Sequence, residues 1–450
     1  MDLFFFGDIL GKNLSMTFLN KRILYLFCIV ASYNVVAQSN DIYKNFSFGK
    51  RQCKASEVII DKPILYNDEV GYGFDYSSVE NVVFNKKSIE GEKSIYFSVK
   101  LPEGNYKVDV VLGGKKSSTT TIKAESRRLM LKEQKSNKKE TLQYSFVVNV
   151  RTPRIDDANK INIKDREKYY LNWDDKLTLE FLGNPIIQSL KISPVSNIKT
   201  IFLAGDSTVT DQDLEPWASW GQFFTNYFTK DVVITNYAVS GSSLSSFKSR
   251  KRLEKIVSVM QSGDYLFIEF GHNDEKIKGE GNGAWGLYTN LLKEFVAKAR
   301  SKGGIPVLVT PTQRRVFNSD GTLKPTHGDF PDAMRKVAAD LQVPLIDVTK
   351  MTTNMYESWG AETSRKAFVQ YPANTFPGQK KELKDNTHFN SFGANEIAKC
   401  VIQGVRDLDL EIAKYIKENT PSYNPNNPDN LTDWTVPMSL RFENTKPDGN

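Results

Sequence analysis

One serine in this chain has the surroundings of a catalytic nucleophile. The run Lys199-Thr-Ile-Phe-Leu-Ala ends at Gly205, and Asp206 and Ser207 follow directly. A short apolar run is typical of a strand buried in a parallel sheet, and a glycine permits a tight turn after it. Such a turn places Ser207 at the carboxyl ends of the strands, where α/β proteins usually bind ligands. The alternative is a turn that only caps the next helix.

A serine hydroxyl needs a base before it can attack a carbonyl, and one of the three histidines suits that role. His388 lies in the polar segment Lys384–Phe389, which we expect to be a loop before a C-terminal helix. Asp385, three residues earlier, is near enough to orient the imidazole and fix its tautomer. Because Ser207 lies far away in the chain, only the fold can bring these groups together.

Donors for the oxyanion of a tetrahedral intermediate follow the next two predicted strands. Gly241 comes after the strand Val232–Asn236, and Asn273 comes after the strand Tyr265–Phe270. The backbone N–H groups of Ser207 and Gly241, with the side-chain amide of Asn273, predict a three-donor oxyanion hole. Removal of one such donor typically lowers the rate about 10²–10³-fold.

Three further residues are candidates for substrate binding. Trp217 lies with Trp220 on a predicted helix after the nucleophile turn, where it either packs in the core or stacks on a sugar. Arg314 follows the fourth strand and either binds a uronic acid carboxylate or lies on a solvated surface. His327 precedes a helix and is either a loop residue or a substrate contact.

The run from His272 to Glu275 does not predict a metal site. These side chains follow one another at a strand end and point in different directions, so they lack the spaced ligands of a zinc site. We expect His272 to be a structural donor behind the oxyanion loop. The sequence predicts no metal and no other cofactor.

The composition bounds the class of protein. The 450 residues, 40% of them hydrophobic and 12% aromatic, indicate a folded protein of two or three domains. The formal charge of +7 is spread along the chain, so no segment resembles a nucleic-acid-binding arm. A mild basic excess is compatible with an acidic substrate, and the sequence does not identify any protein partner.

Residues 1–37 predict a signal peptide. Lys21 and Arg22 precede the apolar run Ile23–Ala31, and small residues then lead to cleavage after Ala37. The residues before Met16 are atypical, so Met16 is the expected start. The apolar run is shorter than the roughly 20 residues of a spanning helix, and no later segment is long enough. We expect export to the periplasm or cell exterior without stable membrane insertion.

Residues 38–195 have the pattern of an all-β domain. Short alternating runs separated by turn residues are typical of a β-sandwich, and the expected strands are 94–100, 106–112, 119–124, 141–150, 176–181 and 186–192. The charged segment Lys132–Glu140 has no apolar periodicity and predicts a loop. The sandwich either binds glycan or completes a wall of the active-site cleft, and the wall is favoured because it has no clear acidic cluster.

Residues 196–420 alternate strands with helices, which predicts a parallel sheet covered on both faces. The expected strands are 199–204, 232–236, 265–270, 305–310 and 343–346, and the expected helices are 217–228, 250–261, 284–302, 328–341 and 391–417. Residues 421–450 are rich in Pro and Asn and predict an extended tail that wraps the surface or is disordered. Cys53 and Cys400 fall in different predicted domains, which favours two buried thiols over a disulfide.

The motifs together resemble a known family, the SGNH or GDSL-type hydrolases. Its four blocks match, in order, Gly205-Asp-Ser207, Gly241, Gly271-His-Asn-Asp274 and Asp385-x-x-His388. The resemblance implies a flavodoxin-like three-layer α/β/α fold and an esterase without a metal. It also implies that Ser207 is the nucleophile, His388 the general base and acid, and Asp385 the residue that orients His388.

Within that family the chain resembles the rhamnogalacturonan acetylesterases at Gly205–Thr210, Pro216–Gly221 and Asn236–Gly241. The upstream half resembles the galactose-binding-like β-sandwich of bacterial two-domain members. Fungal relatives often read Gly-Arg-Ser where this chain has Gly241-Ser-Ser243, so a substrate-facing arginine is missing here. The resemblance implies an acetylated acidic polysaccharide as substrate. The alternatives are an esterase for acetylated xylan or another glycan, and a glycan-binding protein with an inactive hydrolase domain.

Overall fold

The computed structural model describes residues 44–50 and 57–448, which belong to one compact unit. The predicted signal peptide, its cleavage site and Cys53 lie outside the described residues. Cys400 is buried and has a free thiol. The described residues form a parallel sheet covered by helices, a pair of mainly antiparallel sheets, and a separate two-stranded antiparallel sheet.

A five-stranded parallel sheet positions the predicted catalytic residues. Its order is β14-β13-β15-β16-β17, which in chain order is 2-1-3-4-5, the flavodoxin-like order. The strands are β13 (Lys199–Gly205), β14 (Val232–Asn236), β15 (Tyr265–Glu269), β16 (Ile305–Val309) and β17 (Leu345–Ile346). The prediction of a parallel sheet is confirmed, and the strand ends differ from the expected ones by two residues or fewer.

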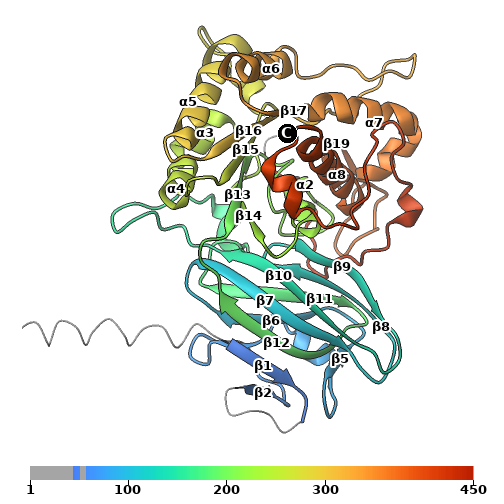
Figure 1. The fold of residues 1–450 in the computed structure, drawn as a ribbon. Coiled ribbons are helices and arrows are strands. Elements are labelled where there is room, and N and C mark those ends of the chain that lie inside the picture. Colours follow the sequence, from blue (N-terminus) through green and yellow to red (C-terminus); the bar gives the residue numbers. More distant parts are fainter. Residues whose placement is uncertain (1–43, 51–56, 449–450) are drawn as a thin grey trace, which may run out of the picture. The chain divides into compact units, whose positions relative to one another are not determined.

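Helices cover both faces of this sheet (Figure 1). They are α2 (Trp220–Phe224), α3 (Leu244–Ser249), α4 (Arg252–Val259), α5 (Thr289–Arg300), α6 (Phe330–Leu341), α7 (Val348–Thr363) and α8 (Ser391–Asp407). Along β13, Ile201 and Leu203 pack into the apolar cluster under α2, α7 and α8. Phe202 and Ala204 pack into the cluster under α3 to α6. Burial on both faces is the reason why this strand is apolar at consecutive positions.

All five predicted helices are shorter in the structure than their patterns indicated, and two of them pass into 3₁₀ turns. The segment 217–228 is helical only from Trp220, and it ends in a 3₁₀ turn at Thr225–Tyr227. The segment 391–417 breaks after Asp407, and a 3₁₀ turn follows at Glu411–Tyr415. Between them Asp409 has a positive φ of 47°, which an α-helix does not accommodate.

The N-terminal part is a two-sheet β-sandwich. One sheet has the order β10-β7-β12-β1-β2 with β4 and β5 at its side, and the other has the order β3-β6-β11-β8-β9. The longer strands are β1 (Lys44–Phe48), β6 (Ile95–Lys100), β7 (Gly104–Gly113), β8 (Ser118–Ala124), β9 (Arg128–Ser136), β10 (Thr141–Val150), β11 (Lys176–Gly183) and β12 (Ile186–Pro194). The short ones are β2 (Val58–Ile60), β3 (Tyr72–Asp75), β4 (Val82–Phe84) and β5 (Ile89–Gly91). Phe46 of the first sheet packs on Phe97 of the second with ring centroids 5.2 Å apart, so the predicted all-β region has an apolar core between its sheets.

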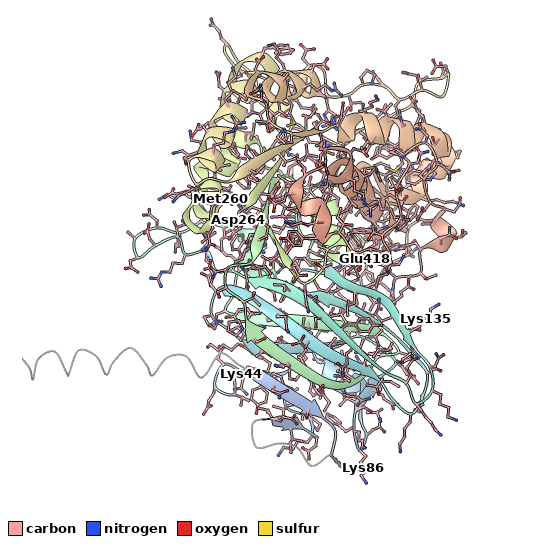
Figure 2. The ribbon with its side chains drawn as sticks, in the orientation of Figure 1. Lys44, Lys86, Lys135, Met260, Asp264 and Glu418 are labelled. Carbon is pink, nitrogen blue, oxygen red and sulfur yellow. The ribbon has the colours of Figure 1, made fainter. Side chains whose placement is uncertain are left out.

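The predicted loop Lys132–Glu140 is wrong for its first half. Residues 132–136 belong to β9, and Lys135 pairs with Thr119 of β8 (Figure 2). Since β9 is the last strand of its sheet, its pairing comes from backbone hydrogen bonds on one side. Charged side chains are common on such edge strands and remove the apolar alternation that sequence patterns depend on.

Buried ion pairs connect the sandwich to the parallel-sheet part. Arg127 Nη2 lies 2.5 Å from Glu215 Oε2, and both side chains are nearly inaccessible to solvent. Ser126 donates a hydrogen bond of 2.6 Å to Asp213. The C-terminal tail joins the same interface, because the Glu215 N–H donates to the carbonyl of Arg441. The tail therefore wraps the surface, one of its two predicted states, and residues 196 and 420 remain our proposed domain boundaries.

Candidate active site

Ser207 lies in a tight turn at the carboxyl end of β13. A Cβ on Gly205 would approach Val209 Cγ2 to 2.5 Å and the carbonyl oxygen of Glu269 to 3.0 Å, so glycine is needed there for space. Asp206 Oδ1 accepts the backbone N–H of Thr208 at 2.9 Å and holds the turn closed. Ser207 itself is 1% exposed.

The structure brings Ser207, His388 and Asp385 into one hydrogen-bonded chain. His388 Nε2 lies 2.9 Å from Ser207 Oγ, and His388 Nδ1 lies 2.8 Å from Asp385 Oδ2. An ionised carboxylate only accepts, so the hydrogen of the neutral imidazole is on Nδ1. Nε2 is then left with a lone pair toward the serine hydroxyl, as a base for that proton requires.

Asp385 and His388 lie on a strand, where the sequence predicted a loop. They belong to β19 (Leu383–Phe389), which pairs with β18 (Phe368–Tyr371) with a shift of register. In this irregular stretch Asp385 Oδ1 accepts the backbone N–H groups of Thr387 at 2.7 Å and His388 at 2.9 Å. This local turn brings the Asp385 carboxylate back to the imidazole three residues later. The motif alone could not show the strand, because its partner β18 is a separate segment.

The Asp385 carboxyl is held in its ionised form. Burial by itself raises its pKa, but the hydrogen bond and charge of His388 and two backbone N–H groups lower it to about 2. Lys446 adds a positive charge, since its Nζ lies 3.4 Å from Asp385 Oδ2. At neutral pH the carboxylate therefore stabilises positive charge on the imidazole.

The predicted oxyanion donors lie on neighbouring loops. Gly241 has φ +73°, a left-handed conformation that favours glycine. Asn273 Nδ2 donates to the carbonyl of Ser242 at 3.1 Å, and Asn273 Oδ1 accepts from Lys276 Nζ at 3.2 Å. The two hydrogen bonds fix which way the amide points, and a second hydrogen on Nδ2 is available for another acceptor.

Trp217 is buried beside the imidazole and lies before helix α2. It is 2% exposed, and its ring meets the His388 ring edge to face with centroids 5.8 Å apart. Its indole N–H donates to the carbonyl of Glu443 at 3.1 Å. The structure therefore shows Trp217 packed in the interior rather than exposed for stacking on a sugar. Its contact with the His388 ring helps to hold that ring in place.

Arg314 and His327 converge on Glu275. Arg314 Nη2 lies 2.5 Å from Glu275 Oε1, and His327 Nδ1 lies 3.1 Å from Glu275 Oε2. The other ring nitrogen of His327 donates to the carbonyl of Thr312 at 2.9 Å. Although burial raises the pKa of Glu275, its hydrogen bonds with His327 and Arg314 bring it below the usual value. Arg314 is thus paired with Glu275 and mostly buried rather than on a solvated surface, and its predicted contact with a substrate carboxylate stays a prediction.

His272 contacts the Arg314–His327–Glu275 cluster through the ring of His327. Its ring lies 4.4 Å from that of His327, and burial lowers its pKa well below the usual value, so the ring is neutral. Its Nε2 is 3.3 Å from Thr312 Oγ1. Among residues 44–50 and 57–448, no group of three or more His, Cys, Asp and Glu side chains is placed to hold a metal ion.

Sequence reasoning missed a buried acidic group beneath the nucleophile turn. Glu269 accepts the Thr208 hydroxyl at 2.9 Å and the Trp220 indole N–H at 2.7 Å. Burial, with the nearby Asp206 carboxyl, raises the pKa of Glu269 to about 8. A single acidic residue at the end of the otherwise apolar strand β15 is the sequence feature that could have indicated a buried carboxyl group here. Glu269 ties the nucleophile turn to α2.

Part of this chain is similar to a known family and to two proteins of Bacillus subtilis. The model of the GDSL-like Lipase/Acylhydrolase family matches residues 203–394. Rhamnogalacturonan acetylesterase RhgT of Bacillus subtilis is 41% identical over 218 residues, which are 48% of this chain and 93% of that protein. The probable rhamnogalacturonan acetylesterase YesY of the same organism is 35% identical over 222 residues, 48% of this chain and 96% of that protein.

The N-terminal sandwich lies outside the family match. The crystal structure of the protein YXIM of Bacillus subtilis is similar over 82% of this chain and 99% of that chain, with a TM-score of 0.44 and 21% identity. In the part of the chain that the structure describes, no helix is long and apolar enough to cross a membrane.

Proposed function

The chain belongs to the GDSL-like lipase/acylhydrolase family, and on that basis we propose that it is a serine esterase that removes O-acetyl groups from rhamnogalacturonan. The family and the two similar acetylesterases make it a carbohydrate ester hydrolase. The observation that carries the proposal is the hydrogen-bonded chain from Ser207 through His388 to Asp385.

Formation of an acetyl-enzyme is the first half of the proposed reaction. Ser207 Oγ attacks the acetyl carbonyl while His388 Nε2 takes its proton, and the ionised Asp385 stabilises the imidazolium. The carbonyl oxygen gains negative charge and accepts hydrogen bonds from the N–H groups of Ser207 and Gly241 and from Asn273 Nδ2. His388 then gives its proton to the departing sugar oxygen.

Hydrolysis of the acetyl-enzyme is the second half. Water attacks the acetyl group on Ser207 Oγ, and His388 takes the proton of that water as it took the proton of the serine. The second tetrahedral intermediate uses the same donors. Its collapse returns the proton to Ser207 and releases acetate.

The polysaccharide specificity is tested by comparing substrates. Acetate release from acetylated rhamnogalacturonan, acetylated xylan and 4-nitrophenyl acetate is measured with the same enzyme preparation. The proposal predicts the highest kcat/KM among the polysaccharides for rhamnogalacturonan. A preference for xylan would select the other glycan esterase, and glycan binding without release of acetate from any ester would select the inactive binding protein.

Two finer features belong to the proposal. We propose export with cleavage after Ala37, which the N-terminal residue of the mature protein would test. We also propose that the sandwich is of the galactose-binding-like kind and acts as a wall of the active-site cleft. Its ion pair with Glu215, close before Trp217 in the chain, supports this role.

A further inference from the structure

The C-terminal segment Glu443–Asp448 crosses the candidate active site. The Glu443 carbonyl accepts from Trp217, and Lys446 Nζ lies 3.4 Å from Asp385 Oδ2. A Cβ on Gly241 would come within 2.9 Å of Asp448 Cβ, so Asp448 lies directly against the proposed oxyanion glycine. Asp448 therefore occupies the side of Gly241 that a Cβ would face.

Two basic side chains of the sandwich hold the Asp448 carboxylate. Lys164 Nζ lies 3.1 Å from Asp448 Oδ2, and Arg166 Nη1 lies 3.8 Å from Asp448 Oδ1. Lys164 also donates to the carbonyl of Ser240 at 2.5 Å, which fixes its ammonium beside Gly241. Lys164 and Arg166 are mostly buried, with side-chain exposures of 17% and 20%, whereas Asp448 is 47% exposed. The cations are therefore held in place, and solvent reaches the anion.

We propose that Lys164 and Arg166 form a carboxylate-binding subsite for a uronic acid unit of the substrate, and that Asp448 occupies this subsite until the substrate displaces it. The inference rests on the proposed esterase function and adds a substrate-binding role for the sandwich. Both residues lie outside the region matched by the family model, residues 203–394.

The chemistry of the subsite fits an acidic glycan. A uronic acid carries a carboxylate like that of Asp448, and guanidinium and ammonium groups bind carboxylates through charge-assisted hydrogen bonds. Because Lys164 is anchored beside Gly241, a carboxylate bound there belongs to the acetylated sugar or to its neighbour in the polymer. A neutral glycan offers no group that replaces Asp448 on these cations.

The segment has other anchors that keep Asp448 near the subsite. Arg166 Nη2 lies 2.5 Å from Glu443 Oε2, and Arg166 Nη1 donates to the Lys446 carbonyl at 3.1 Å. Displacement of Asp448 therefore requires movement of the end of the segment, while Glu443 stays held. Asp448 belongs to the same chain as Lys164 and Arg166, so its carboxylate is present at a high effective concentration and competes with a substrate carboxylate for these cations.

The test compares one acidic ester substrate with one neutral ester substrate. For Lys164→Gln, the ratio of kcat/KM on acetylated rhamnogalacturonan to kcat/KM on 4-nitrophenyl acetate should fall about tenfold or more, because KM for rhamnogalacturonan itself rises. Lys164→Arg keeps the charge and should restore most of the ratio. Lys168→Gln is the matched control on the same turn, because Lys168 pairs with the exposed Asp165. A Lys164→Gln variant that keeps the wild-type ratio overturns the inference.

A second variant tests the occupant. Asp448→Asn weakens a partly exposed ion pair and should raise kcat/KM on 4-nitrophenyl acetate about two- to fivefold. It should also tighten binding of an unacetylated oligogalacturonide, measured by calorimetry, and Lys164→Gln should weaken that binding. Unchanged oligogalacturonide binding in both variants overturns the inference. Failure of the wild-type enzyme to hydrolyse any acetate ester instead overturns the proposed function, and the calorimetry still tests the subsite.

Discussion

Two buried hydrogen-bonded clusters lie near the carboxyl edge of the parallel sheet, and they differ in where their hydrogen bonds end. The first leads from Asp385 through His388 to the hydroxyl of Ser207. In the second, Arg314 and His327 both contact the carboxylate of Glu275. The first cluster ends on the hydroxyl oxygen of the proposed nucleophile, whereas the charged groups of the second cluster pair with one another. A buried histidine beside a carboxylate is therefore not enough to identify a base, and its remaining nitrogen decides the role.

The largest expected effect comes from removing the end of the first cluster. Ser207→Ala should lower kcat for acetate release about 10⁴–10⁶-fold, because no other oxygen takes the place of Oγ. Acetate release from an aryl ester measures the loss, and an unchanged unfolding transition shows that the variant is folded. A variant that keeps even a few per cent of the activity would remove Ser207 from its proposed role.

The other end of the same cluster is tested by Asp385→Asn. An amide in place of the carboxylate favours the wrong tautomer of His388, and kcat should fall about 10⁴-fold. Asp320→Asn is the control, since Asp320 accepts the backbone N–H of Thr322 in a similar but exposed turn with no histidine. Equal losses in both variants would point to the turn rather than to His388.

The donor next to the cluster is tested by Asn273→Ala. Loss of one oxyanion donor should lower kcat about 10²–10³-fold with little change in KM, because the bond forms in the transition state. Asn318→Ala, in an exposed loop, is the control. A rise in KM alone would make Asn273 a substrate-binding residue instead.

A substitution in the second cluster should change the free energy of unfolding more than it changes kcat. Glu275→Gln leaves Arg314 and His327 facing a neutral amide and should lower the free energy of unfolding by about 1–3 kcal/mol. The loss of kcat should stay within about tenfold, far below that of a transition-state donor. Denaturant unfolding and kcat measured on the same preparation separate the two effects. A loss of kcat as large as that of Asp385→Asn would erase the difference between the clusters.

The smallest effect is a pH dependence of stability. The pKa of Asp385 is about 2 in the folded chain against an ordinary 3.8, so its stabilisation is complete above about pH 4 and disappears as the pH falls through 2. The difference in unfolding free energy between wild type and Asp385→Asn should therefore shrink by about 2 kcal/mol over that range. A difference that stays constant from pH 6 to 2 would show that the carboxyl is not held ionised by His388.

The parallel sheet and the catalytic blocks could be predicted because their signals are local. Each buried strand is an apolar run, and a polar motif follows it within a few residues. The polar strands β9 and β19 could not be predicted in this way, since the backbone pairing that makes them strands depends on β8 and β18. The contacts of Arg314 could not be predicted for a related reason, because Glu275 and His327 reach it from two other segments of the chain.

The sequence by itself determined the types and the order of the proposed catalytic groups, since a strand end, a turn and the Asp385–His388 spacing are short-range properties of the chain. Only the tertiary structure decided what surrounds them. Trp217 against the imidazole, Lys446 beside Asp385 and Asp448 against Gly241 join segments far apart in sequence. Such contacts depend on how the sheets and helices pack against one another. Packing depends on the shape and charge of side chains from distant segments, which a local sequence pattern does not contain.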